Sequence, residues 1–248
     1  MKKQMHLASQ YLAAAGISFL EKREDDSHTN LGFNTESGCL ESHYLSDNKD
    51  QLSLSYQNFS LHWKSEKDKV SFSLDGASHK EVVQWLNETS QKYINKPFKY
   101  NFHYDLPYEV NDAYVYKLTS ASELRDLMHL RILSQFSLEK INKELNFNTE
   151  IRIWPHHFDT GLYAEVPGTS ISVGLGLAIP DTVCNEHYLY ASGYNASGQI
   201  DTSKFSKLDN GSWSPDGFNG AILPANNLVE SEGVEFFNQA VSQFKNNN

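Results

Sequence analysis

Three short segments of the chain pair a histidine with an acidic or amide residue two positions away. In a β-strand, residues two apart lie on the same face, so each pair would present its side chains together. Neutral imidazole and carboxylate are ligands that zinc, iron and manganese accept in open sites. The same groups serve as general acids and bases. The segments are Asp26-Ser27-His28-Thr29-Asn30, His103-Tyr104-Asp105 and His157-Phe158-Asp159.

The leading functional hypothesis from these residues is a metal-assisted hydrolase or a related enzyme acting on a small molecule. His28, His157 and Asp159 would hold a divalent cation, namely zinc, iron or manganese. His103 or Asp105 would move protons. A metal-bound water would be the nucleophile, because the sequence shows no activated serine or cysteine.

Two other interpretations stay open. In the first, the chain is a non-enzymatic binding module. Its tyrosine-rich strand 188–194 and the strand carrying Gly174 and Gly176 would form a groove for a sugar-like or other neutral ligand. In the second, the histidines are structural, each donating a ring N–H to a neighbouring carboxylate or backbone carbonyl. The melting temperature, rather than ligand binding, would then depend on His157.

The elements before residue 97 form one α/β half. Apolar residues between Met5 and Ala15 recur every three or four positions, which predicts a helix that stops near Gly16. Ser78 and Glu81 form a capping box, so a second helix is expected there, ending before Pro97. Alternating apolar and polar residues predict strands between these helices. The expected strands are 31–37, 52–56, 59–63 and 70–74.

The elements after residue 120 repeat this order. Residues 97–120 are rich in Pro, Tyr, Asn and Asp, which predicts a connecting segment with a short strand or two. Ser120 and Glu123 form a second capping box before a long amphipathic helix, and a last helix carries an apolar stripe from Val234 to Phe244. The strands expected between them are 151–154, 161–166, 169–177, 188–194 and 218–223.

The expected fold is α+β, with two similar helix–four-strand–helix halves and mainly antiparallel sheets. The halves are residues 1–96 and 121–248, joined by the segment 97–120. An internal duplication is predicted because the element order agrees and two hexapeptides can be aligned. A polar cleft between the halves would then be lined by His28, His103, His157 and Asp159. The aligned hexapeptides are His28-Thr29-Asn30-Leu31-Gly32-Phe33 and His157-Phe158-Asp159-Thr160-Gly161-Leu162.

Composition narrows the class of protein further. The 248 residues are 39% hydrophobic, and 31 Asp and Glu against 21 Lys and Arg give a net charge of −10. This acidity disfavours nucleic acid and anionic membranes as partners and leaves a small molecule as the expected ligand. Cys39 and Cys184 lie far apart, so a disulfide framework is not expected. With no apolar signal-peptide core and no membrane-length apolar stretch, a cytoplasmic location is expected.

Four segments of the chain resemble a family of uncharacterised bacterial proteins. The segment Trp154-Pro155-His156-His157-Phe158-Asp159 is the most distinctive and looks like the signature of a wider domain family of unknown function. The other segments are Asp25–Asn30, His103–Tyr108 and Gly174–Asp181. The resemblance spans most of the chain. It implies a bacterial cytosolic protein and draws attention to the same histidine segments, but it brings no catalytic residues.

Overall fold

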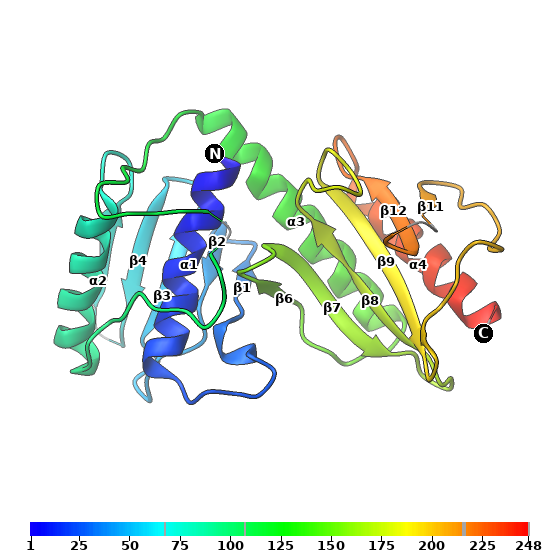
Figure 1. Ribbon diagram of the computed structural model, residues 1–248, viewed down its shortest axis with the longest axis horizontal. Coiled ribbons are helices and arrows are strands. Elements are labelled where there is room, and N and C mark those ends of the chain that lie inside the picture. The colour runs from blue at the N-terminus through cyan, green and yellow to red at the C-terminus, as the bar shows by residue number, and fades with distance from the viewer. Residues whose placement is uncertain (67, 107, 215–216, 248) are drawn as a thin grey trace. The chain divides into compact units, whose positions relative to one another are not determined.

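The chain folds into two compact units, each with helices and antiparallel strands (Figure 1). The computed structural model describes residues 1–66, 68–106, 108–214 and 217–247. Unit 1 comprises Met1–His129 and Ile153–Phe158, and unit 2 comprises Leu130–Arg152 and Asp159–Asn248. The predicted α+β class with antiparallel sheets is confirmed. The internal duplication stays a prediction.

Unit 1 contains an antiparallel meander of five strands. They are β1 (Gly32–Asn34), β2 (Cys39–Glu41), β3 (Gln51–Ser55), β4 (Ser60–Lys64) and β5 (Lys69–Ser73), in this order across the sheet. Leu52 and Leu54 of β3 pair with Trp63 and Leu61 of β4, and all four side chains are fully buried. Exposure alternates along most of β3 and along β5, as the pattern predicted, whereas in β4 the polar residues Ser60 and His62 are buried as well. The short strand β2 was not predicted.

Helix α1 (Lys2–Phe19) packs against β3 and is buried along most of its length (Figure 1). The helix was predicted to stop near Gly16, but it continues to Phe19. Gly16 has another role, because a Cβ atom there would lie 2.3 Å from the carbonyl oxygen of His28. The missing side chain lets the segment around His28 approach the helix closely.

Helix α2 (His79–Ile94) begins and ends as predicted. Ser78 Oγ accepts the N–H of Glu81, and the Glu81 carboxylate accepts the N–H of Ser78, so both halves of the capping box are present. The helix ends at Asn95, whose φ of 56° is left-handed. In the described part of 97–120 the predicted strands are replaced by one isolated bridge, between Val115 and Ser78.

Helix α3 (Ala121–Glu144) begins in unit 1 and continues into unit 2. Ser120 Oγ accepts the N–H of Glu123 at 3.1 Å, which is one half of the predicted capping box. The Glu123 carboxylate instead accepts the backbone N–H of Lys2 at 3.3 Å. After α3, strand β6 (Arg152–Trp154) returns the chain to unit 1, where Ile153 exchanges two backbone hydrogen bonds with Leu31.

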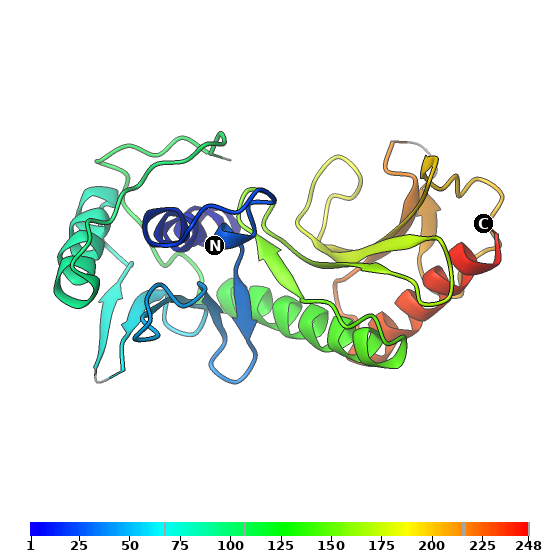
Figure 2. The same cartoon turned by 90° about the horizontal axis from the view of Figure 1, so that it is seen from below.

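Unit 2 is a twisted antiparallel sheet covered on one side by helices. Its strands are β7 (Asp159–Glu165), β8 (Ser172–Ala178), β9 (Tyr188–Asn195), β10 (Gly198–Gln199), β11 (Ser212–Ser214) and β12 (Gly220–Pro224), and its last helix is α4 (Glu230–Asn246). The order is β11-β12-β9-β8-β7, with β10 paired to β9. Figure 2 shows α3 and α4 on the same side of the sheet. Strands β10 and β11 were not predicted.

Among the described residues, no helix is both long enough and apolar enough to cross a membrane.

Candidate functional site

The first predicted segment folds as a turn rather than a strand. Residues Ser27–Thr29 form a 3-10 helix, η1, and Asp26 before it has a left-handed φ of 56°. The backbone N–H and the hydroxyl of Thr29 both donate to the Asp26 carbonyl at 2.9 Å. The prediction that Asp26, His28 and Asn30 share a strand face is therefore wrong, since the strand begins only at Gly32.

The Asp26 carboxylate pairs with His103, which lies 77 residues further along the chain. Asp26 Oδ2 is 2.9 Å from His103 Nε2, and the two side chains are 41% and 38% exposed. Asp26 Oδ1 is buried and has no hydrogen-bond partner among the described residues. A neutral His103 would donate its Nε2–H to the carboxylate, which leaves Nδ1 as a proton acceptor.

His28 is buried beside this pair and is held as a neutral imidazole. The backbone N–H of Arg23 donates to His28 Nδ1 at 3.3 Å, so the neutral ring carries its proton on Nε2. Burial lowers the pKa of His28 below its ordinary value, and the Asp26 carboxylate opposes this lowering only in part. The positive charges of Lys22 and Arg23 add to it, as does His103 whenever it is protonated. His28 is therefore a hydrogen-bond donor at neutral pH.

Another histidine, which the sequence did not single out, forms hydrogen bonds to this turn. His43 follows β2, and its Nε2 lies 2.8 Å from Asn30 Oδ1 and 3.0 Å from the Ser27 carbonyl oxygen. Both partners are acceptors, so Nε2 of His43 carries a proton. Nothing in the residues next to His43 could have indicated a contact formed 13 positions away.

A cavity of about 410 Å³ opens beside His28 and His43. Its volume falls in the range of small-molecule sites, roughly 300–1,000 Å³. Its lining carries charges of both signs, because Glu21 is acidic and Lys22 and Arg23 are basic. The remaining lining residues are Leu20 and Tyr44. A small polar molecule suits this lining better than an apolar one.

The Trp-Pro-His-His-Phe segment also folds as a turn. Residues 155–158 connect β6 to β7, and Phe158 has a φ of 59°. Buried polar residues of α1 hold this turn: Gln10 Nε2 donates to the Pro155 carbonyl at 2.7 Å, and His6 Nε2 lies 2.8 Å from the same oxygen. The His6 ring also stacks on Phe158 at 4.8 Å. The prediction that His157 lies on a strand is therefore wrong.

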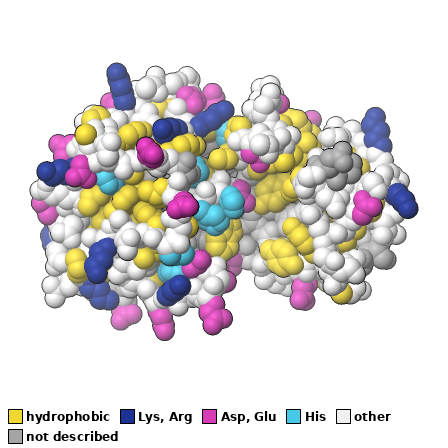
Figure 3. All heavy atoms as spheres, viewed as in Figure 1, with side chains coloured by type: hydrophobic (Ala, Val, Ile, Leu, Met, Phe, Trp, Pro, Cys, Tyr) yellow, Lys and Arg dark blue, Asp and Glu magenta, His cyan; other side chains and the backbone are white. Residues whose placement is uncertain are grey.

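The three histidine segments of unit 1 are neighbours in space. The Tyr104 ring lies 5.3 Å from that of His103 and 5.8 Å from that of His156, and His156 is 4.3 Å from His157. The Tyr104 hydroxyl donates to Gln10 Oε1 at 2.9 Å, which ties this contact to α1. Figure 3 shows histidine side chains gathered on one face of the molecule. We name the following residues the histidine cluster: Asp26, His28, His43, His103, His156 and His157.

The predicted metal ligands do not form a recognised metal site. His28 and His157 belong to unit 1, whereas Asp159 belongs to unit 2. Across the described part of the chain, no group of three or more His, Cys, Asp or Glu side chains is arranged to hold a metal ion. A histidine that binds a metal usually donates its other ring N–H, but Nδ1 of His28 accepts a hydrogen bond instead. Asp105, the other predicted proton-transfer residue, is exposed.

Asp159 has a different partner, in its own unit. The Tyr190 hydroxyl donates to Asp159 Oδ2 at 2.8 Å, while Asp159 Oδ1 is buried without a hydrogen-bond partner among the described residues. Burial and the Asp159 carboxylate raise the pKa of Tyr190 well above its ordinary value. Tyr190 therefore stays protonated and acts as a fixed donor.

Gly176 of the predicted ligand groove and its cross-strand partner Gly161 accommodate this tyrosine. A Cβ at Gly176 would lie 2.6 Å from the Tyr190 ring, and a Cβ at Gly161 would lie 2.8 Å from its hydroxyl. The sequence indicated a close approach at Gly174 and Gly176 by a helix or a ligand. At Gly176 the approaching group is instead the side chain of Tyr190, which occupies the space that the glycines leave.

Comparisons of the chain with protein-family models, with curated proteins and with solved structures found no match. The resemblance to a family of uncharacterised bacterial proteins therefore stays a prediction.

Proposed function

We propose that the protein is an enzyme that acts on a small polar molecule by general acid–base catalysis. The observation that carries this proposal is the 2.9 Å contact between Asp26 Oδ2 and His103 Nε2. A carboxylate on one ring nitrogen fixes the tautomer of a histidine and stabilises the imidazolium that forms when the other nitrogen takes a proton. His103 Nδ1 is the proposed base, and Asp26 is the residue that positions it.

His28 has the complementary role in this proposal. Its lowered pKa keeps the ring neutral, and its proton lies on Nε2. A neutral donor next to a base resembles sites in which the surroundings give two titratable groups different tasks. The cavity beside His28 and His43 would hold the substrate, and the His28 N–H would stabilise negative charge that develops on it.

Hydrolysis is the reaction class that these roles fit best. His103 Nδ1 would take a proton from water while the water oxygen bonds to the electrophilic atom of the substrate. The same proton would then pass to the leaving group as the substrate bond breaks, which returns His103 to its neutral form. These steps need no metal ion. The predicted zinc, iron or manganese remains a separate proposal, which elemental mass spectrometry of protein purified without chelator or His tag would test.

The test is a panel of small chromogenic esters, amides and phosphate esters, assayed with the wild-type chain and two variants. His103→Ala removes the proposed base. His129→Ala removes another exposed histidine, on α3 and outside the histidine cluster. General acid–base groups typically contribute about 10²–10⁴-fold to rate. We expect a loss of that size for His103→Ala and full activity for His129→Ala.

A second measurement separates catalysis from a structural role. ¹⁵N-detected NMR of the histidine side chains reports which ring nitrogen is protonated. We expect Nε2–H in both neutral His103 and neutral His28. Activity that survives His103→Ala, or His103 protonated on Nδ1 in the neutral form, would contradict the proposal. A lowered melting temperature with unchanged activity would favour purely structural histidines.

A further inference from the structure

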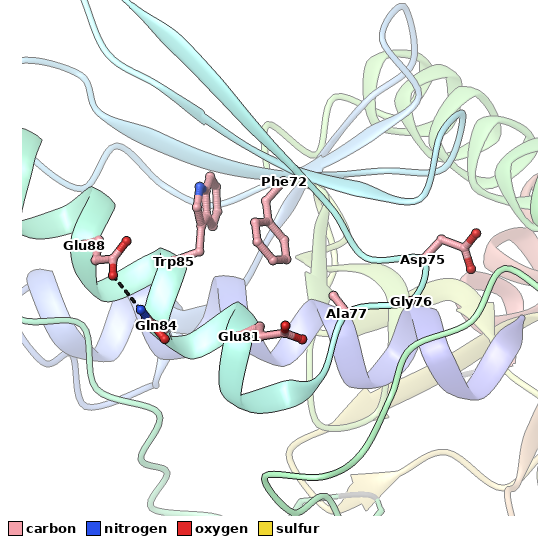
Figure 4. A pocket seen from close by; sticks show the side chains of 8 residues that line it. All are labelled: Phe72, Asp75, Gly76, Ala77, Glu81, Gln84, Trp85 and Glu88. Atoms are coloured by element: carbon pink, nitrogen blue, oxygen red, sulfur yellow. Dashed lines mark hydrogen bonds between the residues drawn. The ribbon is translucent and has the colours of Figure 1, made fainter.

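A second cavity lies in unit 1 between strand β5 and helix α2, outside the histidine cluster. Its volume is about 450 Å³, within the roughly 300–1,000 Å³ range of ligand sites. Strand β5 ends the strand order of its sheet. The lining residues are Phe72, Asp75, Gly76, Ala77, Glu81, Gln84, Trp85 and Glu88, drawn in Figure 4.

Two aromatic side chains form the apolar part of this cavity. Phe72 projects from β5 and Trp85 from α2, and Figure 4 shows their rings side by side between the two elements. The ring centroids are 5.2 Å apart and the planes are tilted by 33°. Both residues are partly exposed. Such a pair offers aromatic surface for alkyl groups and for cation–π contacts.

Three carboxylates surround the aromatic pair. Asp75, Glu81 and Glu88 are all exposed, and no lining residue carries a positive charge. Each carboxylate is fixed by a bond to one of its oxygens: Asp75 Oδ1 accepts the N–H of Leu118 at 2.7 Å, and Glu88 Oε1 accepts from Gln84 at 2.8 Å. Glu81 Oε2 accepts the N–H of Ser78 at 2.8 Å. Each carboxylate can accept further bonds.

The spacing of these charges favours an elongated ligand. Glu81 and Glu88 lie seven residues apart on α2, which corresponds to about 10 Å along the helix axis, and Gln84 and Trp85 lie between them. A single metal ion needs its oxygen ligands within roughly 2.0–2.6 Å of one point, and two side chains separated by two helical turns do not converge in this way. An elongated cation can contact several carboxylates in turn.

We propose that this cavity binds a linear polyamine. Its ammonium groups would pair with Glu81, Glu88 and Asp75, and its methylene segments would lie on Phe72 and Trp85. Charge complementarity and the aromatic surface together favour such a ligand. The site is independent of the histidine cluster and adds a ligand to the proposed enzyme.

The experiment is isothermal titration of the full chain with spermidine. We expect saturable binding at one site. Binding should weaken at least tenfold in the double variant Glu81→Gln/Glu88→Gln. Glutamine also serves at the third position of a capping box, so Glu81→Gln removes the charge and keeps the helix start. A Trp85→Leu variant should also weaken binding, since it removes the larger ring.

The chain supplies a matched control for these variants. Gln135 donates to Glu139 at 2.8 Å on α3, in the same arrangement as Gln84 and Glu88. Glu139→Gln therefore removes one charge and alters one hydrogen bond of the same kind, at a residue of unit 2 that does not line the cavity. We expect unchanged spermidine affinity for Glu139→Gln and for His103→Ala, with circular dichroism confirming that every variant is folded.

Three results would overturn the polyamine site. The first is the absence of saturable spermidine binding to the wild-type chain. The second is an affinity that Glu139→Gln lowers as much as the double variant does, which would indicate attraction to the net negative charge alone. The third is a lysine-rich peptide that binds through the same carboxylates while spermidine does not compete with it, which would assign the cavity to a protein partner.

Discussion

Asp26 and Asp159 have the same hydrogen-bonding arrangement, but their hydrogen-bond partners differ in chemistry. In each carboxylate one oxygen is hydrogen-bonded at 2.8–2.9 Å and the other is buried without a partner among the described residues. The partner of Asp26 is His103, a partly exposed imidazole, whereas the partner of Asp159 is Tyr190, whose pKa is raised well above its ordinary value. Only the first partner belongs to a residue type that exchanges protons near neutral pH.

The comparison shows that a carboxylate takes its role from the group that it contacts. An aspartate beside histidine can stabilise a transient positive charge, whereas one beside a phenol that stays protonated only accepts a hydrogen bond. The sequence treats the two segments as equivalent, because both contain His-x-Asn or His-x-Asp followed by a glycine. The hydrogen-bond partners of the two aspartates come from other segments of the chain, and they determine how the two carboxylates differ in role.

Removing the partner of each aspartate should produce the largest contrast. His103→Phe should lower activity by about 10²–10⁴-fold, because it removes the proposed base. Tyr190→Phe should leave activity unchanged, but it should lower the free energy of unfolding by about 1–3 kcal/mol, because it leaves Asp159 without its donor. Steady-state kinetics and urea unfolding measure the two effects. If Tyr190→Phe lost activity but kept its full stability, the proposed difference between the roles of His103 and Tyr190 would be wrong.

A pH series should distinguish the two units next. Burial lowers the pKa of His28, His62 and His79, all in unit 1, below the ordinary value of 6.5. Each binds its proton more weakly when folded, so unfolding takes up protons as the pH falls below about 6.5. Stability should therefore decrease between about pH 7 and pH 5, by at most about 1.4 kcal/mol per pH unit for each histidine.

Hydrogen exchange with mass spectrometry can assign this loss to a unit. Nine of the ten histidines lie in unit 1, and His187 is the one in unit 2. After correction for intrinsic exchange rates, peptides from β3, β4 and α2 should lose protection between pH 7 and pH 5. Peptides from β8 and β9 should keep it. Equal loss in both units would show that the buried histidines do not control the acid sensitivity.

Two glycines on one strand offer the third test, within unit 2. A Cβ at Gly176 would lie 2.3 Å from the Thr160 carbonyl oxygen and 2.6 Å from the Tyr190 ring, whereas a Cβ at Gly174 would lie 3.0 Å from the Ser192 hydroxyl and 3.9 Å from the Tyr194 ring. Gly176→Ala should lower the free energy of unfolding by about 1–3 kcal/mol, and Gly174→Ala by clearly less. Urea unfolding of both variants measures this. If Gly176→Ala left the free energy of unfolding unchanged, the Tyr190 ring would be able to move aside without loss of stability.

Most helices and longer strands could be predicted from the sequence, because burial of one face produces a regular spacing of apolar residues. The alternation in residues 52–74 and the capping box at Ser78 and Glu81 correspond to β3–β5 and α2. Gly16 was misread as a helix end because a glycine inside a helix gives the same signal as a glycine at its end. Its actual neighbour, the His28 carbonyl oxygen, belongs to a later segment.

The candidate site could be predicted only in part. Sequence spacing identified His28, His103 and His157, and their segments are neighbours in unit 1. Spacing reports local geometry alone, so it could not reveal that Asp26 pairs with a histidine 77 residues away. It also placed these histidines on strands, whereas turns with left-handed residues, Asp26 and Phe158, hold two of the segments.

The smallest expected effect concerns the charge of Asp26. The Asp26 carboxylate favours the protonated form of His28 and partly opposes the effect of burial. Asp26→Asn should therefore lower the pKa of His28 further, whereas Asp25→Asn, one residue away, should leave it nearly unchanged. In unit 2, Asp159→Asn should likewise lower the pKa of Tyr190, because Asp159 also favours the protonated partner.

NMR titration of the histidine Cε1–H signals and ultraviolet titration of tyrosine would measure these shifts. A pKa of His28 that rises in Asp26→Asn would mean that the carboxylate does not act on this ring. The proposed division between His28 as a neutral donor and His103 as a base would then lose its electrostatic support, since the Asp26 carboxylate is the charge that both rings share.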